Sequence, residues 1–233
     1  IRQMKNKIII GSRGSDLALW QANHVKNQLE ELGVAVEIKI IKTQGDKFQH
    51  LSFDKLEGKG FFTKEIEEKL LTREIDLAVH SHKDLETTPP AGLSIAAVSE
   101  RENPADLLLI KRGAVNTKLP LSLKENAIVG TSSARRKSQL LSFRGDIDLK
   151  DLRGNVPTRI QKLREEQYDA IIIAAAGAER LKIDLSEFHV EEFDPAEFVP
   201  APAQGVLALQ IREGDNELAA LLSKINDQTA WET

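Results

Sequence analysis

Lys83 and Asp84 form an adjacent pair of ionisable residues at the end of a predicted strand. Before them, apolar residues at 75, 77 and 79 alternate with other types, which is the two-residue period of a strand. Ligands of open α/β sheets bind beyond the carboxyl ends of the strands, so a carboxylate held there by a rigid strand is well placed for chemistry. The alternative for an isolated lysine–aspartate pair is an ion pair at the edge of a loop.

Arginine recurs where a predicted strand meets a predicted helix. A helix N-terminus carries roughly half a positive charge, so a cation there costs about 0.3–1 kcal/mol. An anion bound at each junction removes this conflict, because backbone N–H groups, the helix dipole and a guanidinium then all favour it. The alternative is that the arginines lie on solvated faces or pair with acids such as Glu165 and Asp151. Because the feature recurs at three junctions, we expect a ligand with several carboxylates or phosphates, bound by Arg13, Arg135, Arg136, Arg153 and Arg159.

Residues 7–41 have the pattern of a β-α-β unit with strands at 7–11 and 36–41. Between the strands, apolar residues recur at steps of three and four, as on an amphipathic helix. Ser15 is suited to cap this helix and Gly33 to end it. A helix at 63–72 and strands at 94–98 and 107–110 are expected further along the chain.

From Ile128 the pattern restarts as a second α/β domain. Predicted strands at 128–131, 148–152 and 170–174 alternate with predicted helices at 133–142, 155–166 and 175–181. After prolines at 200 and 202, a strand at 206–211 and a helix at 216–225 are assigned to the first domain, because a lone strand–helix pair cannot bury its apolar face. We therefore expect one α/β domain formed by residues 1–103 plus 204–233 and a second formed by residues 104–203.

The composition is that of an ordinary soluble globular protein. At 41% hydrophobic and 29% charged residues with a net charge of −4, the chain does not favour general binding to nucleic acid or to a membrane. No apolar run approaches the ~20 residues of a membrane-spanning helix, and no signal-peptide pattern is seen. Cysteine is absent, which excludes disulfides and thiolate chemistry in this chain. The expected location is the cytoplasm.

Two histidines and a long loop are weaker signals. His80 and His82 share a face of a predicted strand, but no third ligand lies at a metal-like spacing. We therefore expect core or hydrogen-bonded histidines and no metal site. Residues 43–60 have no sustained period and are predicted to form a long mobile loop that carries Lys55 and Lys59.

Several motifs in one order resemble the porphobilinogen deaminase (hydroxymethylbilane synthase) family. They are Ser-Arg-Gly-Ser at 12–15, Gly-Lys-Gly-Phe-Phe-Thr-Lys-Glu at 58–65, His-Ser-His-Lys-Asp at 80–84, Gly-Thr-Ser-Ser-Ala-Arg-Arg at 130–136, Leu-Arg-Gly-Asn-Val-Pro-Thr-Arg at 152–159 and Pro-Ala-Gln-Gly at 202–205. The match runs from about residue 8 to about residue 225. Their shared order is a stronger signal than any one motif alone.

The resemblance implies a transferase of tetrapyrrole (haem) biosynthesis. Such an enzyme joins four porphobilinogen molecules head to tail, with loss of ammonia at each step, and gives hydroxymethylbilane. The resemblance also implies two domains similar to type-2 periplasmic binding proteins, with the active site in the cleft between them. We expect a monomer that acts on this small molecule and binds a dipyrromethane cofactor.

The resemblance further implies roles for named residues. Asp84, with Lys83, would be catalytic: its carboxylate would hold the pyrrole N–H groups and stabilise the cationic azafulvene left when ammonia departs. The cofactor would be bound by Arg13, Ser81, Lys83, Asp84, Ser133, Arg135, Arg136, Arg153 and Arg159. The substrate would be bound by Arg13, Phe62, Arg153, Arg159, Arg180 and Gln204. Lys55 and Lys59 on the long loop would cover the cleft.

One departure from the family concerns the cofactor. The family carries dipyrromethane on a cysteine of a third, C-terminal domain, whereas this chain contains no cysteine and stops about where that domain should begin. We therefore expect the third domain to be absent from this chain: either it was removed, which can leave the chain inactive, or it lies outside this sequence, or the protein is a shortened relative without a covalent anchor. The residues also leave open a non-catalytic module of the same fold that binds polycarboxylates or other anions. Asp84 discriminates between these functions, because a pure anion binder gains nothing from a carboxylate among arginines.

Overall fold

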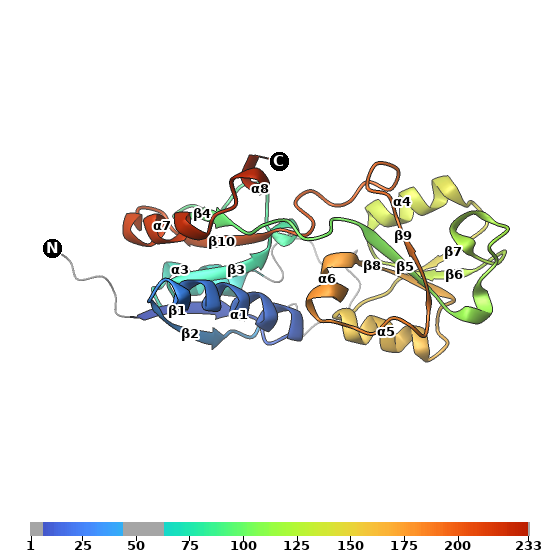
Figure 1. Cartoon of the computed structure of the whole chain (residues 1–233), viewed down its shortest axis with the longest axis horizontal. Coiled ribbons are helices and arrows are strands. Elements are labelled where there is room, and N and C mark those ends of the chain that lie inside the picture. Colours follow the sequence, from blue (N-terminus) through green and yellow to red (C-terminus); the bar gives the residue numbers. More distant parts are fainter. Residues whose placement is uncertain (1–6, 44–62, 233) are drawn as a thin grey trace. The chain divides into compact units, whose positions relative to one another are not determined.

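The computed structural model of this 233-residue chain describes residues 7–43 and 63–232. The chain divides into two compact units, which we call unit 1 (Ile1–Glu102 with Gly205–Thr233) and unit 2 (Asn103–Gln204). Within the described residues, each unit contains a five-stranded sheet accompanied by helices (Figure 1). Unit 2 is therefore an insertion between two segments of unit 1.

The sheet of unit 1 has the strand order β2-β1-β3-β10-β4. Its strands are β1 (Lys7–Ser12), β2 (Ala35–Ile40), β3 (Leu77–Ser81), β4 (Leu93–Val98) and β10 (Leu207–Arg212). Strand β1 is parallel to β2 and β3, whereas β10 runs antiparallel to both β3 and β4. The last strand of the chain thus lies inside the sheet that the first strand begins.

Helix α1 (Asp16–Glu31) follows β1 because its sequence carries a cap and an apolar face. The Ser15 side chain accepts a hydrogen bond from the backbone N–H of Ala18, as predicted for an N-cap. Val25 and Leu29 on its inner face are buried in the core of unit 1. The other helices of unit 1 are α3 (Lys64–Leu71), α7 (Asn216–Leu222) and α8 (Gln228–Glu232).

The sheet of unit 2 has the strand order β7-β6-β8-β5-β9. Its strands are β5 (Asp106–Ile110), β6 (Ile128–Gly130), β7 (Asp148–Lys150), β8 (Ala170–Ala174) and β9 (His189–Glu192). Strand β6 is parallel to β7 and β8, and β5 is antiparallel to β8 and β9. The helices are α4 (Ala134–Phe143), α5 (Val156–Arg164) and α6 (Ala175–Arg180).

Strand β5 is buried on both faces. Leu107 and Leu109 belong to one apolar cluster, whereas Leu108 and Ile110 belong to another, so successive side chains enter cores on opposite sides of the sheet. A strand covered on both sides needs a continuous apolar run. This explains why the unbroken run at 107–110 predicts a strand although it does not alternate.

Some elements differ from the sequence predictions. The pattern does not predict β9, because this edge strand contains two glutamates and its only aliphatic residue, Val190, is exposed. Helix α8 is also not predicted. The predicted strand at 148–152 ends at Lys150, and the predicted helix at 216–225 ends at Leu222 and continues as a 3-10 turn (Ser223–Ile225).

Gly205→Ala is expected to destabilise the protein strongly. Gly205 has φ +91°, and an added Cβ would overlap the backbone oxygen of Glu102. Gly214→Ala is a matched control, because Gly214 has φ +77° and no described atom lies within 4 Å of its added Cβ. We expect the control to lose roughly 1–2 kcal/mol, the cost of a left-handed backbone for an L-residue, and Gly205→Ala to lose clearly more. Urea unfolding measures both free energies, and equal losses would contradict the overlap.

Candidate active site

Asp84 lies in a short 3-10 turn (His82–Asp84) that directly follows β3. The backbone N–H of His82 donates to the carbonyl oxygen of Val206 (2.9 Å), which ties the turn to the segment that leads into β10. Lys83 and Asp84 are exposed at this carboxyl end of β3. The pair therefore lies where a ligand of an α/β sheet is expected, in a turn beyond the strand.

A small cavity of about 80 Å³ opens beside Asp84. Arg13, Ser81 and Asp84 all line it, so predicted site residues from separate parts of the sequence meet at one place. The Ser81 hydroxyl oxygen accepts a hydrogen bond from Gln21 Nε2 (2.8 Å), which leaves the hydroxyl proton available as a donor. The cavity thus combines a guanidinium and a hydroxyl that can bind an anion with a carboxylate that can face a positive charge.

Gln21 and Thr63 also line this cavity, and the sequence analysis does not identify them. Gln21 is a polar residue on the buried face of α1, and a polar residue in an apolar stripe is the signal that could have found it. Thr63 precedes α3, and its hydroxyl lies 3.4 Å from Glu67 Oε2. No comparable signal in the sequence distinguishes Thr63.

His80 lies on β3, also lines this cavity and is held by a chain of hydrogen bonds. Its Nε2 lies 3.1 Å from Gln210 Oε1, and Gln210 Nε2 donates to Glu67 Oε1 (3.0 Å). Because the Gln210 amide nitrogen is directed to Glu67, its oxygen accepts from His80, which fixes the proton of the neutral imidazole on Nε2. Burial lowers the pKa of His80 to about 4, although the hydrogen bond to Gln210 opposes this shift. His80 is the buried, hydrogen-bonded histidine that the sequence predicts.

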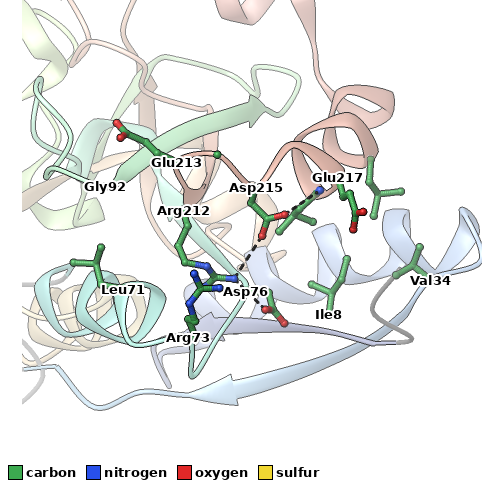
Figure 2. A pocket seen from close by; sticks show the side chains of 13 residues that line it. Ile8, Val34, Leu71, Arg73, Asp76, Gly92, Arg212, Glu213, Asp215 and Glu217 are labelled. Carbon is green, nitrogen blue, oxygen red and sulfur yellow. Dashed lines mark hydrogen bonds and ion pairs between the residues drawn. The ribbon is translucent and has the colours of Figure 1, made fainter. Parts of the chain in front are cut away.

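Unit 1 contains a much larger cavity, of about 740 Å³, at the opposite end of its sheet. It is lined by Ile8 and Asp76 near the amino ends of β1 and β3 and by Arg212 at the carboxyl end of β10 (Figure 2). Arg212 Nη2 lies 3.2 Å from Asp76 Oδ1 and 3.5 Å from Asp215 Oδ2. Both terminal nitrogens of Arg212 are engaged, because Nη1 donates to backbone carbonyls. Predicted site residues meet at the smaller cavity, and none of those in the described part of the chain lines this larger one.

In unit 2, Arg135 and Arg136 in the first turn of α4 share one carboxylate. Arg135 Nη2 lies 2.7 Å from Asp106 Oδ2, and Arg136 Nη2 lies 2.6 Å from Asp106 Oδ1. Asp106 is the first residue of β5, and the sequence analysis does not identify it. The two acids given above as alternative partners of the arginines have other contacts. Asp151 pairs with Lys137 (2.6 Å), and Glu165 accepts a hydrogen bond from Gln161 (3.2 Å).

The remaining predicted residues of unit 2 lie on several elements. The Ser133 hydroxyl accepts from the backbone N–H of Arg136 and caps α4. Arg153 precedes α5, and Arg159 Nε in the first turn of that helix donates to the carbonyl of Gly154 (2.8 Å). Arg180 is buried at the end of α6. Gln204 is also buried, and its Nε2 donates to the Pro104 carbonyl (2.7 Å) and to Asp106 Oδ1 (2.9 Å).

Three predicted residues lie outside the described part of the chain. They are Phe62, Lys55 and Lys59. The expected substrate contact of Phe62 and the expected covering of the cleft by Lys55 and Lys59 stay predictions.

Comparison with known proteins identifies the family. A sequence profile for the porphobilinogen deaminase dipyrromethane cofactor binding domain matches residues 8–220. Porphobilinogen deaminase of Syntrophomonas wolfei is 48% identical over 225 residues, which cover 95% of this chain and 71% of that protein. The Bacillus anthracis porphobilinogen deaminase is 47% identical over 229 residues, which cover 97% of this chain and 72% of that protein. This chain belongs to the porphobilinogen deaminase family.

Family membership confirms the function class predicted from the motifs. Porphobilinogen deaminases are transferases of tetrapyrrole biosynthesis, and the matched profile names the expected dipyrromethane cofactor. In the described residues, no helix is both long and apolar enough to cross a membrane.

Solved structures with low sequence identity show the fold. An ancestral cationic amino acid solute binding protein has a TM-score of 0.57 at 14% identity, covering 98% of this chain and 91% of that chain. A putative methionine-binding lipoprotein of Bacillus subtilis has a TM-score of 0.55 at 11% identity, covering 98% of this chain and 93% of that chain. The predicted pair of α/β domains resembling type-2 periplasmic binding proteins is therefore confirmed.

His80→Gln is expected to change how stability depends on pH. The folded-state pKa of about 4 is below the ordinary value of 6.5, so the unfolded chain binds the proton more readily between these values. The contribution of neutral His80 to the free energy of unfolding is therefore fully present above pH 6.5. It is lost as the pH falls toward 4, by about 1.4 kcal/mol per pH unit. In His80→Gln this loss is absent, so the stability difference between parent and variant should shrink as the pH falls. Urea unfolding at a series of pH values measures it.

The matched control is His24→Gln, which removes an imidazole from the partly exposed surface of α1. This variant should retain the pH dependence that His80 causes in the parent. The role of burial would be contradicted if the parent and His80→Gln differed in unfolding free energy by the same amount at every pH from 6.5 to 4.

Proposed function

We propose that the small cavity beside Asp84 is the reaction site at which this chain condenses porphobilinogen with loss of ammonia. The observation that supports this proposal is that Asp84 and Arg13 line one cavity at the carboxyl end of β3. Porphobilinogen carries two carboxylates and an aminomethyl group on a pyrrole ring. Arg13 and the Ser81 hydroxyl suit a carboxylate, and Asp84 suits the positive charge that develops as ammonia leaves.

The Asp84 carboxylate acts by electrostatic stabilisation. Its turn is anchored where it leaves β3, by the strand and by the bond from the His82 N–H to Val206, so the carboxylate needs little reorganisation when charge develops nearby. Pyrrole N–H groups are donors and a carboxylate is an acceptor, so Asp84 can also orient the ring. Lys83 lies in the same turn and offers a further cation for a substrate or cofactor carboxylate.

The arginines of unit 2 suit a polycarboxylate such as dipyrromethane. Arg136 is buried, and its Nε has no hydrogen-bond partner among the described residues, so a buried donor is left for an acceptor from outside the protein. Arg135, Arg136, Arg153, Arg159 and Ser133 are the residues that we propose to hold the cofactor carboxylates, with Arg180 and Gln204 on the substrate side. When bound, dipyrromethane supplies the pyrrole to which the first substrate unit is joined. None of the 233 residues is a cysteine, so its thioether is not formed by this part of the protein.

The working state that we propose is a cytoplasmic monomer that binds no nucleic acid. A net charge of −4 supports the absence of general nucleic-acid binding. Size-exclusion chromatography with light scattering tests the monomer, because a mass near 25.9 kDa is expected for this chain alone.

Asp84→Asn should abolish turnover and retain binding. The amide keeps the shape of the side chain but cannot balance a developing cation, so we expect kcat to fall by at least two orders of magnitude while the Kd for porphobilinogen changes less than about threefold. Porphobilinogen consumption by the cofactor-loaded protein measures the first quantity, and calorimetric titration measures the second.

Glu86→Gln is the matched control, because it removes an exposed carboxylate two residues away. Its kcat should equal that of the parent. Normal turnover by Asp84→Asn would remove Asp84 from the catalytic role, and a parent that binds no porphobilinogen would refute the proposed site.

A further inference from the structure

Asp106 is a carboxylate enclosed by three donor side chains. Its exposed fraction is 0%, and it receives Arg135 Nη2 at 2.7 Å, Arg136 Nη2 at 2.6 Å and Gln204 Nε2 at 2.9 Å. Burial would raise the pKa of Asp106, but the charge and hydrogen bond of Arg136, with the bonds from Arg135 and Gln204, lower it below its usual value. The group is therefore an anion when the arginines are in place.

The two arginines depend on this anion for their placement. Like charges repel, yet Arg135 and Arg136 are neighbours and both reach the same carboxylate, one at each oxygen. Other contacts complete their orientation: Arg136 Nη1 donates to the Ile172 carbonyl (3.2 Å), and Arg135 Nη1 donates to the Val199 carbonyl. The cluster keeps a net charge of +1, because one carboxylate balances only one of the two guanidiniums.

Stability alone is a weak reason for such a cluster. A buried ion pair gains little or nothing over apolar residues of the same volume, because desolvation of the charges offsets their attraction. The cluster instead fixes two guanidiniums at the N-terminus of α4 and leaves a net positive charge there. Arg135 keeps 24% of its side chain exposed, and the Arg136 Nε is a buried donor with no described partner. These are the features of a preorganised anion-binding site, whose donors are already in place in the absence of the anion.

We infer that Asp106 is a positioning residue of the carboxylate-binding site: it holds Arg135 and Arg136 in a fixed arrangement to receive a carboxylate of dipyrromethane or of the chain grown on it. This inference rests on the proposed function, which supplies the ligand. Asp106 itself does not touch the ligand, because both of its oxygens are occupied by donors from the protein. Gln204 supports Asp106 in turn, since its amide bridges Asp106 and the Pro104 carbonyl.

The test is a double-mutant cycle read out by calorimetric binding of free dipyrromethane. Asp106→Asn should raise the Kd at least tenfold, and Arg135→Gln should also raise it. In the double variant, Asp106→Asn should add less than about twofold to the effect of Arg135→Gln, because the aspartate acts through the arginine. A merely structural role predicts that the two effects multiply. Full multiplication, or an unchanged Kd in Asp106→Asn, would overturn the inference.

Two further variants complete the test. Asp151→Asn is the matched control, because it neutralises an exposed carboxylate that pairs with Lys137, a residue of α4 like Arg135 and Arg136. Its Kd should equal that of the parent.

If circular dichroism shows that Asp106→Asn does not fold, Arg135→Lys takes its place. Lysine keeps the charge but cannot reach Asp106 and the Val199 carbonyl at once, so we expect at least a tenfold loss of affinity, and retained affinity would overturn the inference. A parent without any affinity for dipyrromethane would refute the proposed cofactor site and with it the proposed function, whereas a binding parent with an unaffected Asp106→Asn refutes this inference alone.

Discussion

The antiparallel pairing of β10 between β3 and β4 is the interaction on which the rest of the structure depends. Leu207, Leu209 and Ile211 of β10 enter the same apolar core as α1 and β1, so unit 1 is completed only by a segment that follows all of unit 2. The same pairing holds the turn with Asp84, because the His82 N–H bonds to Val206 at the start of β10. The position of the Asp84 carboxylate is thus a consequence of a long-range strand pairing.

Much of the fold is predictable from local sequence, because periodicity and caps are local properties. The alternating run that ends at Ser81, the Ser15 cap and the apolar run at 107–110 all correspond to elements of the structure. Edge strand β9 is not predictable in this way, because half-exposed charged residues hide its period. The site is predicted in part: Arg13, Ser81 and Asp84 meet in one cavity, whereas Gln21 and Thr63 become neighbours only through tertiary contacts.

The sequence around the arginines of α4 predicts only part of their surroundings. Their conflict with the helix dipole is visible in the sequence and indicates that an anion is needed. Sequence alone does not indicate that a protein carboxylate supplies one of the negative charges, because Asp106 is about thirty residues away, just before the predicted strand at 107–110. The protein carboxylate balances one guanidinium, and the remaining positive charge explains why an external anion is still favoured.

The central place of β10 also affects how the protein forms during synthesis. The ribosome delivers β1 to β4 first, then the whole of unit 2, and only afterwards the strand that joins β3 to β4. Until β10 emerges, β3 and β4 each present an unpaired edge, which is a surface prone to pairing with other chains. Unit 2 is continuous and can complete its core in the meantime. During synthesis there is therefore a stage at which unit 2 can already be folded while unit 1, which contains Asp84, still lacks β10.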